Sequence, residues 1–218
     1  RSITVSLLTE DSASLTLREC EFYKNTANRG AAVYIKATKS SSLTIVNSRL
    51  RENNSLISGA VFVSGRVKLM LQHVDLTGNT SLNSAGLDAS GTFDPISISN
   101  CLFQGNSGQS VILLNKGTTV QVMTVTQSSF LSNDAVAFNL NSSSFTGSDM
   151  TVSQNTKRTM NLFSSTVTLT KTKFINNSEA TFGAVANVSQ KSTLVMKECD
   201  VLGNASLSKA GALFVQLS

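Results

Sequence analysis

The amino-acid sequence predicts an all-β protein, a single-stranded parallel β-helix of about eight coils of ~26 residues each. Three observations support this fold class. A motif made of an apolar residue, any two residues and Asn recurs along the chain, and apolar and polar residues alternate before each motif. Charged residues are only 14% of the sequence, against about 25% in typical domains. Surface helices favour Glu and Lys, so this composition favours strands.

The recurring Asn sets the coil length. Successive Asn are 22 to 28 residues apart and span nearly the whole sequence, so we expect 1–218 to form one repeat domain. Asn tolerates left-handed backbone, and stacked amides can hydrogen-bond from one coil to the next. We therefore predict a structural asparagine ladder that turns the chain at each coil, and no ligand site there. The ladder residues are Asn25, Asn53, Asn79, Asn106, Asn133, Asn155, Asn177 and Asn204.

The first strand of each coil is expected just before its Asn. Seven positions before the apolar member of the motif, the residue is apolar in all eight coils, starting with Leu15 and Leu43. Five positions before it, the residue is apolar everywhere except at Gly147. The residues between these rows are mostly polar, as at Thr16 and Thr44. Alternation with a period of two is typical of a strand with one buried face.

A second strand is expected after each Asn. Small residues lead into runs such as "AAVYI" at 31–35, "GAVFV" at 59–63 and "GALFV" at 211–215, and polar turns lead on to the next coil. The main alternative is a leucine-rich repeat, which "LRECEFYKNTA" at 17–27 matches loosely. The position two residues after the Asn argues against it, because a buried row would not accept Lys157 and Glu179.

The apolar-x-x-Asn motif followed by Gly-Ala-apolar resembles the F-x-x-N and G-G-A-[ILV] repeats of the chlamydial polymorphic membrane proteins, which are surface adhesins with a β-helical passenger. It is also similar to repeats in eukaryotic extracellular proteins of the pectin-lyase-like fold. The resemblance covers nearly all of the chain. It implies a right-handed helix, in agreement with the general preference for right-handed crossovers, and an extracellular or cell-surface location.

The function expected from these features is that of a non-catalytic structural or adhesion module, a rigid rod or filament scaffold. The alternative is a carbohydrate-active enzyme, a polysaccharide lyase or hydrolase of the pectin-lyase-like fold. Glycoside hydrolysis needs two carboxylates about 5–9 Å apart, whereas the outward stack of Glu21, Arg49 and Asp75 alternates in sign and indicates charge pairing. The one histidine, His73, is expected on the surface. We predict no catalytic, cofactor-binding or metal-binding residue and no cofactor.

The three cysteines are expected to be buried free thiols. Cys20, Cys101 and Cys199 occupy the same inward position in coils one, four and eight. Three strand spacings place Cys20 and Cys101 on the order of 14 Å apart, and four place Cys101 and Cys199 on the order of 19 Å apart. A disulfide needs Cα atoms within about 7 Å.

Expected partners follow from charge and from the chain ends. Residues 1–68 hold ten Lys or Arg and five acidic residues, which suits an anionic partner or, as we favour, a solvated face. The sequence starts without Met and stops at "GALFVQLS", partway through a coil, so we expect a piece of a longer chain with other coils or subunits stacking on its open ends. A host or matrix protein or a glycan is a further expected partner. We expect no nucleic acid and no direct membrane insertion, since no apolar run reaches ~18 residues.

Three sequons are candidate N-glycosylation sites. Asn141 and Asn176 are expected in loops or turns, and the sequence does not orient Asn187. The sequons at Asn53, Asn79 and Asn204 coincide with the ladder and should be inaccessible.

Overall fold

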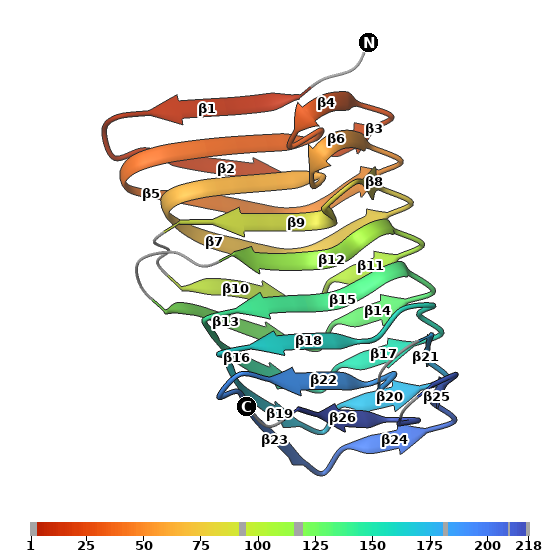
Figure 1. Cartoon of the computed structure of the whole chain (residues 1–218). Helices are drawn as coiled ribbons and strands as arrows, with labels where there is room; N and C mark the ends of the chain where they lie inside the picture. The colour runs from red at the N-terminus through yellow and green to blue at the C-terminus, as the bar shows by residue number, and fades with distance from the viewer. Residues whose placement is uncertain (1–3, 92–94, 116–119, 181–182, 209, 217–218) are drawn as a thin grey trace.

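The coils stack in parallel and in register from one end of the chain to the other. The computed structural model describes residues 4–91, 95–115, 120–180, 183–208 and 210–216, and these residues contain strands and no helix. The N-terminus lies at one end of the stack and the C-terminus near the other (Figure 1). Leu15 pairs with Leu43, Leu43 with Leu69 and Leu69 with Ile96, so the predicted apolar rows are confirmed.

Each coil contributes three strand segments, which stack into three faces (Figure 1). Strands β5 (Val33–Arg51) and β7 (Val61–Thr77) run through the turn between coils and belong to all three faces. The first face also contains β2 (Ser14–Arg18), β10 (Ile96–Ser99), β13 (Gln121–Thr126), β16 (Ser143–Ser148), β19 (Thr166–Thr170) and β23 (Thr193–Lys197).

The second face follows the first corner of each coil and precedes the ladder. It contains β3 (Glu21–Tyr23), β11 (Leu102–Gln104), β14 (Ser129–Leu131), β17 (Thr151–Ser153), β20 (Lys173–Ile175) and β24 (Asp200–Leu202).

The third face follows the ladder. It contains β1 (Val5–Thr9), β9 (Ser84–Ser90), β12 (Ser107–Asn115), β15 (Asp134–Asn141), β18 (Met160–Phe163), β22 (Ala186–Ser189) and β26 (Leu213–Val215). Short strands lie between the ladder and this face, namely β4 (Thr26–Arg29), β6 (Asn54–Ser58), β8 (Thr80–Ser81), β21 (Ser178–Glu179) and β25 (Ala205–Ser206).

The core is a continuous apolar column inside the coils. Four phenylalanines pack against one another in this column: Phe103 stacks on Phe130 with ring centroids 4.6 Å apart, Phe130 and Phe138 are 4.5 Å apart, and Phe138 and Phe145 are 5.0 Å apart. All four are fully or almost fully buried. Gly147 interrupts one apolar row because Met150 and Leu169 already fill the space that its side chain would take. The apolar core therefore stays filled at Gly147, where the alternating pattern lacks an apolar side chain.

The corners lie one residue away from where the sequence placed them. None of the eight ladder Asn has a positive φ; the residue before each of them does, with φ between 50° and 62°. A left-handed residue turns the chain, and the Asn after it can then direct its amide along the stack. The prediction that the Asn itself turns the chain was therefore wrong. The corner residues are Lys24, Glu52, Gly78, Gly105, Ser132, Gln154, Asn176 and Gly203.

Candidate functional site

The predicted asparagine ladder is confirmed and is structural. From Asn25 to Asn177, the backbone N–H and the Nδ2 group of each ladder Asn donate to Oδ1 of the next Asn, at 2.8–3.1 Å. From Asn53 onward, Nδ2 also donates to the carbonyl of the apolar residue that begins the motif of the preceding coil, as from Asn53 to Phe22. From Asn53 to Asn177 these side chains are buried, so the ladder offers no group to a ligand.

The two ends of the ladder differ from its middle. Asn25 is 1% exposed, yet its Oδ1 has no hydrogen-bond partner among the described residues. Asn204 is half-buried instead of inaccessible, because only one neighbouring coil covers it among the described residues. The ladder thus ends in a buried acceptor on the side of the first coil.

The cysteines are free, as predicted, and only Cys101 is fully buried. The expectation of burial was wrong for Cys20 and Cys199, which are half-buried because they lie in the first and eighth coils. Burial raises the pKa of the Cys101 thiol to about 11. Its thiolate is therefore scarce at ordinary pH, and the thiolate is the reactive form.

We expect iodoacetamide at pH 8 to label Cys20 and Cys199 well before Cys101. The reason is that Cys101 combines burial with a pKa of about 11, so it reacts only when its coil opens. Peptide mass spectrometry over a labelling time course measures the three rates. Labelling all three cysteines in urea is the control. Equal rates in the native protein would contradict the placement of Cys101 in the core.

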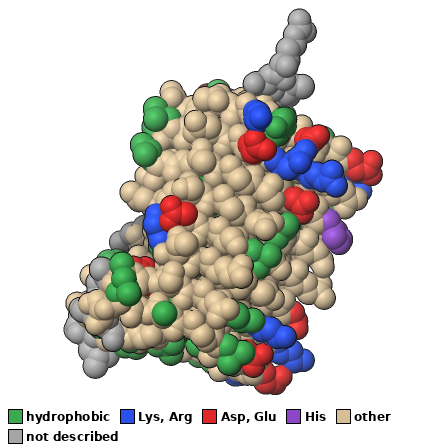
Figure 2. Space-filling model, turned by 90° about the vertical axis from the view of Figure 1, so that its right-hand side faces the viewer, with side chains coloured by type: hydrophobic (Ala, Val, Ile, Leu, Met, Phe, Trp, Pro, Cys, Tyr) green, Lys and Arg blue, Asp and Glu red, His purple; other side chains and the backbone are tan. Residues whose placement is uncertain are grey.

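Four basic residues of the first coils form ion pairs, namely Lys24, Lys39, Arg49 and Arg51. Glu21, Arg49 and Asp75 lie in register as predicted, but Glu21 pairs with Arg51, while Arg49 Nε lies 3.8 Å from Asp75. Acidic and basic side chains accordingly alternate along one edge of these coils (Figure 2). His73 occupies the corner before the second face, with φ 52°. These charges are exposed, and such pairs contribute at most about 1 kcal/mol each.

Asp88 is the one acidic residue that is buried among the described residues. It lies on β9, 3% exposed, and its Oδ1 has no hydrogen-bond partner there. Burial raises the pKa of this carboxyl above its usual value, and a hydrogen bond from Ser58 and the charge of Arg29 only partly oppose that effect. The ionised carboxylate therefore destabilises the native state near neutral pH.

We expect Asp88→Asn to stabilise the protein at pH 7 by about 1 kcal/mol, because it removes an incompletely solvated charge. The native pKa lies above the unfolded value, so the carboxyl favours folding when protonated and this contribution is lost as pH rises through the native pKa. The gain should therefore shrink as pH falls toward 4. Urea unfolding of both proteins at pH 4 and pH 7 measures it. A variant that is less stable at pH 7 would show that Asp88 is needed as a carboxylate.

The candidate glycosylation sites occupy three different settings. Asn176 is exposed at a corner, as expected for a turn. Asn141 is the last residue of β15, half-buried, and its Oδ1 accepts a hydrogen bond from Ser142 at 3.2 Å; it does not lie in a loop. Asn187 lies on β22 and is half-buried.

A groove of about 640 Å³ lies over the third face where the coils are shortest. Phe138 and Met160 follow their ladder Asn by five residues, whereas Ala186 follows Asn177 by nine. The short connections leave β15 and β18 uncovered. We call this feature the amide groove; it is lined by Gln109, Val136, Asn139, Thr156, Lys157, Arg158, Asn161, Glu179, Ala180 and Asn187. Composition and motifs did not reveal it, but the two 22-residue spacings of the ladder Asn were a signal.

Three outward amides form the floor of the amide groove. Asn139, Asn161 and Asn187 are paired in register on β15, β18 and β22, which lie one after another in the stack (Figure 1). Asn187 Nδ2 donates to Asn161 Oδ1 at 3.2 Å, and Asn161 Nδ2 donates to Asn139 Oδ1 at 3.3 Å. Asn187 Oδ1 is buried and has no partner among the described residues. This second amide row, unlike the internal ladder, faces a groove.

The described lining of the amide groove carries two cations, Lys157 and Arg158, and one anion, Glu179. Arg158 Nε lies 3.0 Å from Glu179 Oε2, the Arg158 backbone N–H donates to the same oxygen, and these side chains are 13% and 10% exposed. Lys157 Nζ donates to the Gly108 carbonyl at 2.9 Å and lies 3.8 Å from Asp134. Glu179 is the one acidic residue among the described lining residues. The groove therefore lacks, within the described chain, the carboxylate pair that glycoside hydrolysis uses.

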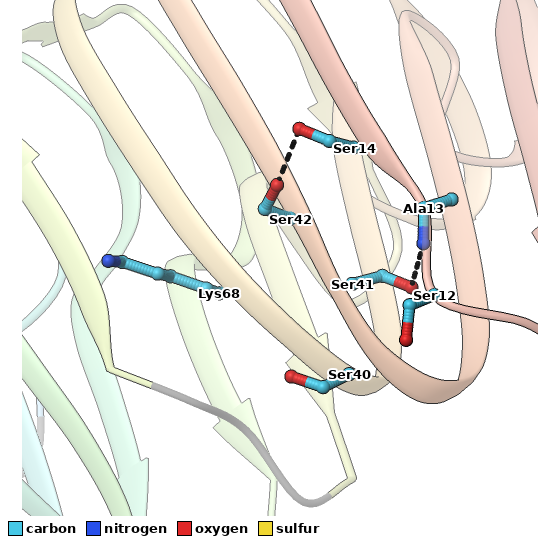
Figure 3. Close-up of a pocket in the computed structure, with 7 residues that line it drawn as sticks. All are labelled: Ser12, Ala13, Ser14, Ser40, Ser41, Ser42 and Lys68. Atoms are coloured by element: carbon cyan, nitrogen blue, oxygen red, sulfur yellow. Dashed lines mark hydrogen bonds between the residues drawn. The ribbon is translucent and has the colours of Figure 1, made fainter.

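A second hollow, of about 360 Å³, lies at the turn that leads into the first face. Figure 3 shows five serines, Ala13 and Lys68 around it. Ser42 donates to Ser14 Oγ at 2.8 Å, and the Ala13 N–H donates to Ser41 Oγ at 3.2 Å. These groups connect one coil to the next, and the hollow holds no acid or imidazole among its described residues.

Comparison with known proteins agrees with this architecture. Residues 2–156 match a family described as "Right handed beta helix region". The chain belongs to the right-handed β-helix family. The coils after residue 156 continue the same register, through Phe174 paired with Val201. No curated protein and no solved structure matches the chain. The described residues contain no helix long and apolar enough to cross a membrane.

Proposed function

We propose that this right-handed β-helix is a non-catalytic structural or adhesion module, a rigid rod that carries binding surfaces outside the cell or on its surface. The observation that carries the proposal is the unbroken internal ladder. Seven successive Asn-to-Asn steps join eight coils through buried hydrogen bonds, beside a continuous apolar core. Fully satisfied buried networks make a structure rigid.

Native-state hydrogen exchange and a turnover assay test this proposal together. We expect the ladder amides of coils two to six to exchange only through global unfolding, as in a single rigid body. We also expect no new reducing ends and no unsaturated product from a panel of neutral and acidic polysaccharides. Product formation would favour the alternative, a polysaccharide lyase or hydrolase. Independent opening of the middle coils would contradict a rigid rod.

We further propose that another coil stacks on the first coil of the rod. The buried Oδ1 of Asn25 supports this, because a ladder Asn in an adjoining coil would donate to it as Asn25 donates to Asn53. The partner is thus a β-coil with an Asn in register. Adding such a coil by fusion should raise the unfolding temperature and protect the amide of Asn25; an unchanged temperature would contradict the proposal.

We expect glycans on Asn176 and Asn141 when the chain is secreted by eukaryotic cells, and none on the ladder residues Asn53 and Asn79. Asn176 is the exposed one of the two candidates and should carry the higher occupancy. The ladder side chains are 1% and 0% exposed. Glycopeptide mapping before and after deglycosylation measures occupancy. Full occupancy at Asn53 or Asn79 in folded protein would contradict the inward orientation of the ladder.

A further inference from the structure

We propose that the first coil binds a further β-coil whose outward charges are opposite to its own, and that like charges prevent it from binding the eighth coil of a second copy. This rests on the coil stacking proposed above and specifies the partner. The partner coil carries an acidic side chain opposite Arg18, a basic side chain opposite Glu21 and a ladder Asn opposite Asn25. The register of the coils carries the proposal, because it fixes what each position of an adjoining coil would face.

The inward positions of the two end coils match each other. The first and eighth coils lie at opposite ends of the stack (Figure 1), and the row that begins at Leu15 ends at Leu194. Cys20 and Cys199 likewise hold the same position in their coils, and all four side chains are half-buried against the core. An eighth coil stacked on the first coil of another copy would therefore continue the apolar rows, and its ladder Asn could donate to Asn25. Unpaired strand edges of this kind favour self-association.

The outward positions of the same two coils carry like charges. The row that begins at Arg18 ends at Lys197. The row that begins at Glu21 ends at Asp200. All four side chains are exposed. Stacking the eighth coil on the first would place cation beside cation and carboxylate beside carboxylate, and like charges directly opposite on adjacent strands are destabilising.

A third like pair would form at the corner between the first and second faces. Glu19 and Glu198 are exposed corner residues of the two end coils, with φ of 55° and 52°. Both ends of the described stack thus present the same order of charges, one cation followed by two carboxylates. Charged side chains on an edge strand protect it from pairing with another copy.

Within the rod, charges that face each other in register are opposite in sign. Among the described strand pairings, charged residues meet at three places: Glu21 with Arg49, Arg49 with Asp75, and Lys173 with Asp200. None of these described pairings joins two like charges. Continuing this pattern past the first coil requires a basic residue opposite Glu21 and an acidic residue opposite Arg18, the reverse of what the eighth coil offers.

Oxidation of the intact protein reports stacking of the eighth coil on the first. Cys199 of one copy would then lie one strand spacing, about 4.8 Å, from Cys20 of the next copy, within the Cα range of about 4.4–6.8 Å for a disulfide. The variant Lys197→Glu/Asp200→Asn removes two like pairs and places a carboxylate beside Arg18. In a glutathione redox buffer at low salt, we expect it to form this disulfide roughly ten times faster than the wild type, since each like pair weakens association a few-fold.

Lys68→Glu/Asp149→Asn is the matched control. It changes the net charge by the same amount at exposed positions outside both end coils, so its cross-linking should equal that of the wild type. In about 1 M salt, where the Debye length falls to about 3 Å, wild-type cross-linking should rise toward that of the Lys197→Glu/Asp200→Asn variant. Peptide mass spectrometry identifies the disulfide, light scattering measures the mass of the assemblies, and circular dichroism checks that the variants remain folded.

Two results would overturn the proposal. Rapid Cys20–Cys199 cross-linking of the wild type at low salt would show that a second copy is an accepted partner. A Lys197→Glu/Asp200→Asn variant no faster than the control would show that like charges are not the barrier.

A fusion experiment separates this proposal from coil stacking itself. A second copy of the eighth coil is fused ahead of the first coil, either unchanged or with its charges reversed by Lys197→Glu, Glu198→Lys and Asp200→Lys. We expect the reversed coil to protect the Asn25 amide from exchange at least about tenfold more than the unchanged coil. Equal protection by both would overturn the charge pattern and leave stacking intact, whereas protection by neither would contradict stacking.

Discussion

Replacing Asn106 by Ala should lower the free energy of unfolding by at least about 3 kcal/mol, from the loss of several buried hydrogen bonds. Four bonds involve this side chain: Oδ1 accepts from the backbone and side-chain nitrogens of Asn79, and Nδ2 donates to the Leu76 carbonyl and to Asn133. The side chain is fully buried, so water cannot replace them in the native state. Urea unfolding followed by circular dichroism measures the change.

Asn25→Ala is the matched control for this effect. The Asn25 side chain makes one hydrogen bond, from Nδ2 to Asn53, and its Oδ1 has no partner among the described residues. The expected loss is therefore smaller, about 1 kcal/mol. Equal losses for the two substitutions would contradict this account, because Asn106 is bonded to a ladder Asn on each side and Asn25 to only one.

Phe130→Ala should cost about 3–5 kcal/mol, the usual result of emptying a large buried aromatic site. Phe130 is fully buried and lies between Phe103 and Phe138, with ring centroids 4.6 and 4.5 Å away. Its neighbours belong to strands fixed by the coil register and cannot move far into the cavity. Thermal and urea unfolding measure the loss.

An exposed phenylalanine provides the comparison for that substitution. Phe163, at the end of β18, is 40% exposed, and Phe163→Ala should cost less than about 1 kcal/mol. A loss for Phe130→Ala as small as that for Phe163→Ala would contradict a packed interior column.

The repeat made most of the fold predictable from sequence. Residues such as Leu43, Leu69 and Ile96 recur at the same offset from Asn, and parallel stacking in register turns that offset into contact. The buried ladder followed from the same register. Features that recur in every coil can therefore be predicted from a single sequence.

Features that depend on exact backbone angles or on differences between coils were harder to predict. The left-handed corner residues Lys24, Glu52 and Gln154 are chemically dissimilar, so no residue type marks the corner. Arg51 pairs with Glu21 because a long exposed side chain can reach a residue diagonal to it, which register alone does not show. The amide groove lies where the connections after the ladder Asn are short, so it depends on a departure from the repeat.

One cross-link tests the register of the coils most directly. The Cys101 backbone N–H donates to Ser128 Oγ at 3.1 Å, so position 128 lies next to Cys101 in the following coil, with both side chains buried. Adjacent strands are about 4.8 Å apart, within the Cα range of about 4.4–6.8 Å for a disulfide.

Ser128→Cys, refolded in a glutathione redox buffer, should form a disulfide with Cys101 that peptide mass spectrometry identifies before reduction. Ser129→Cys is the control and should leave Cys101 free, because Ser129 neighbours Leu102 on the outward side of β14. A disulfide with Cys101 from position 129, or none from position 128 in folded protein, would contradict the 27-residue register on which the ladder and the core depend.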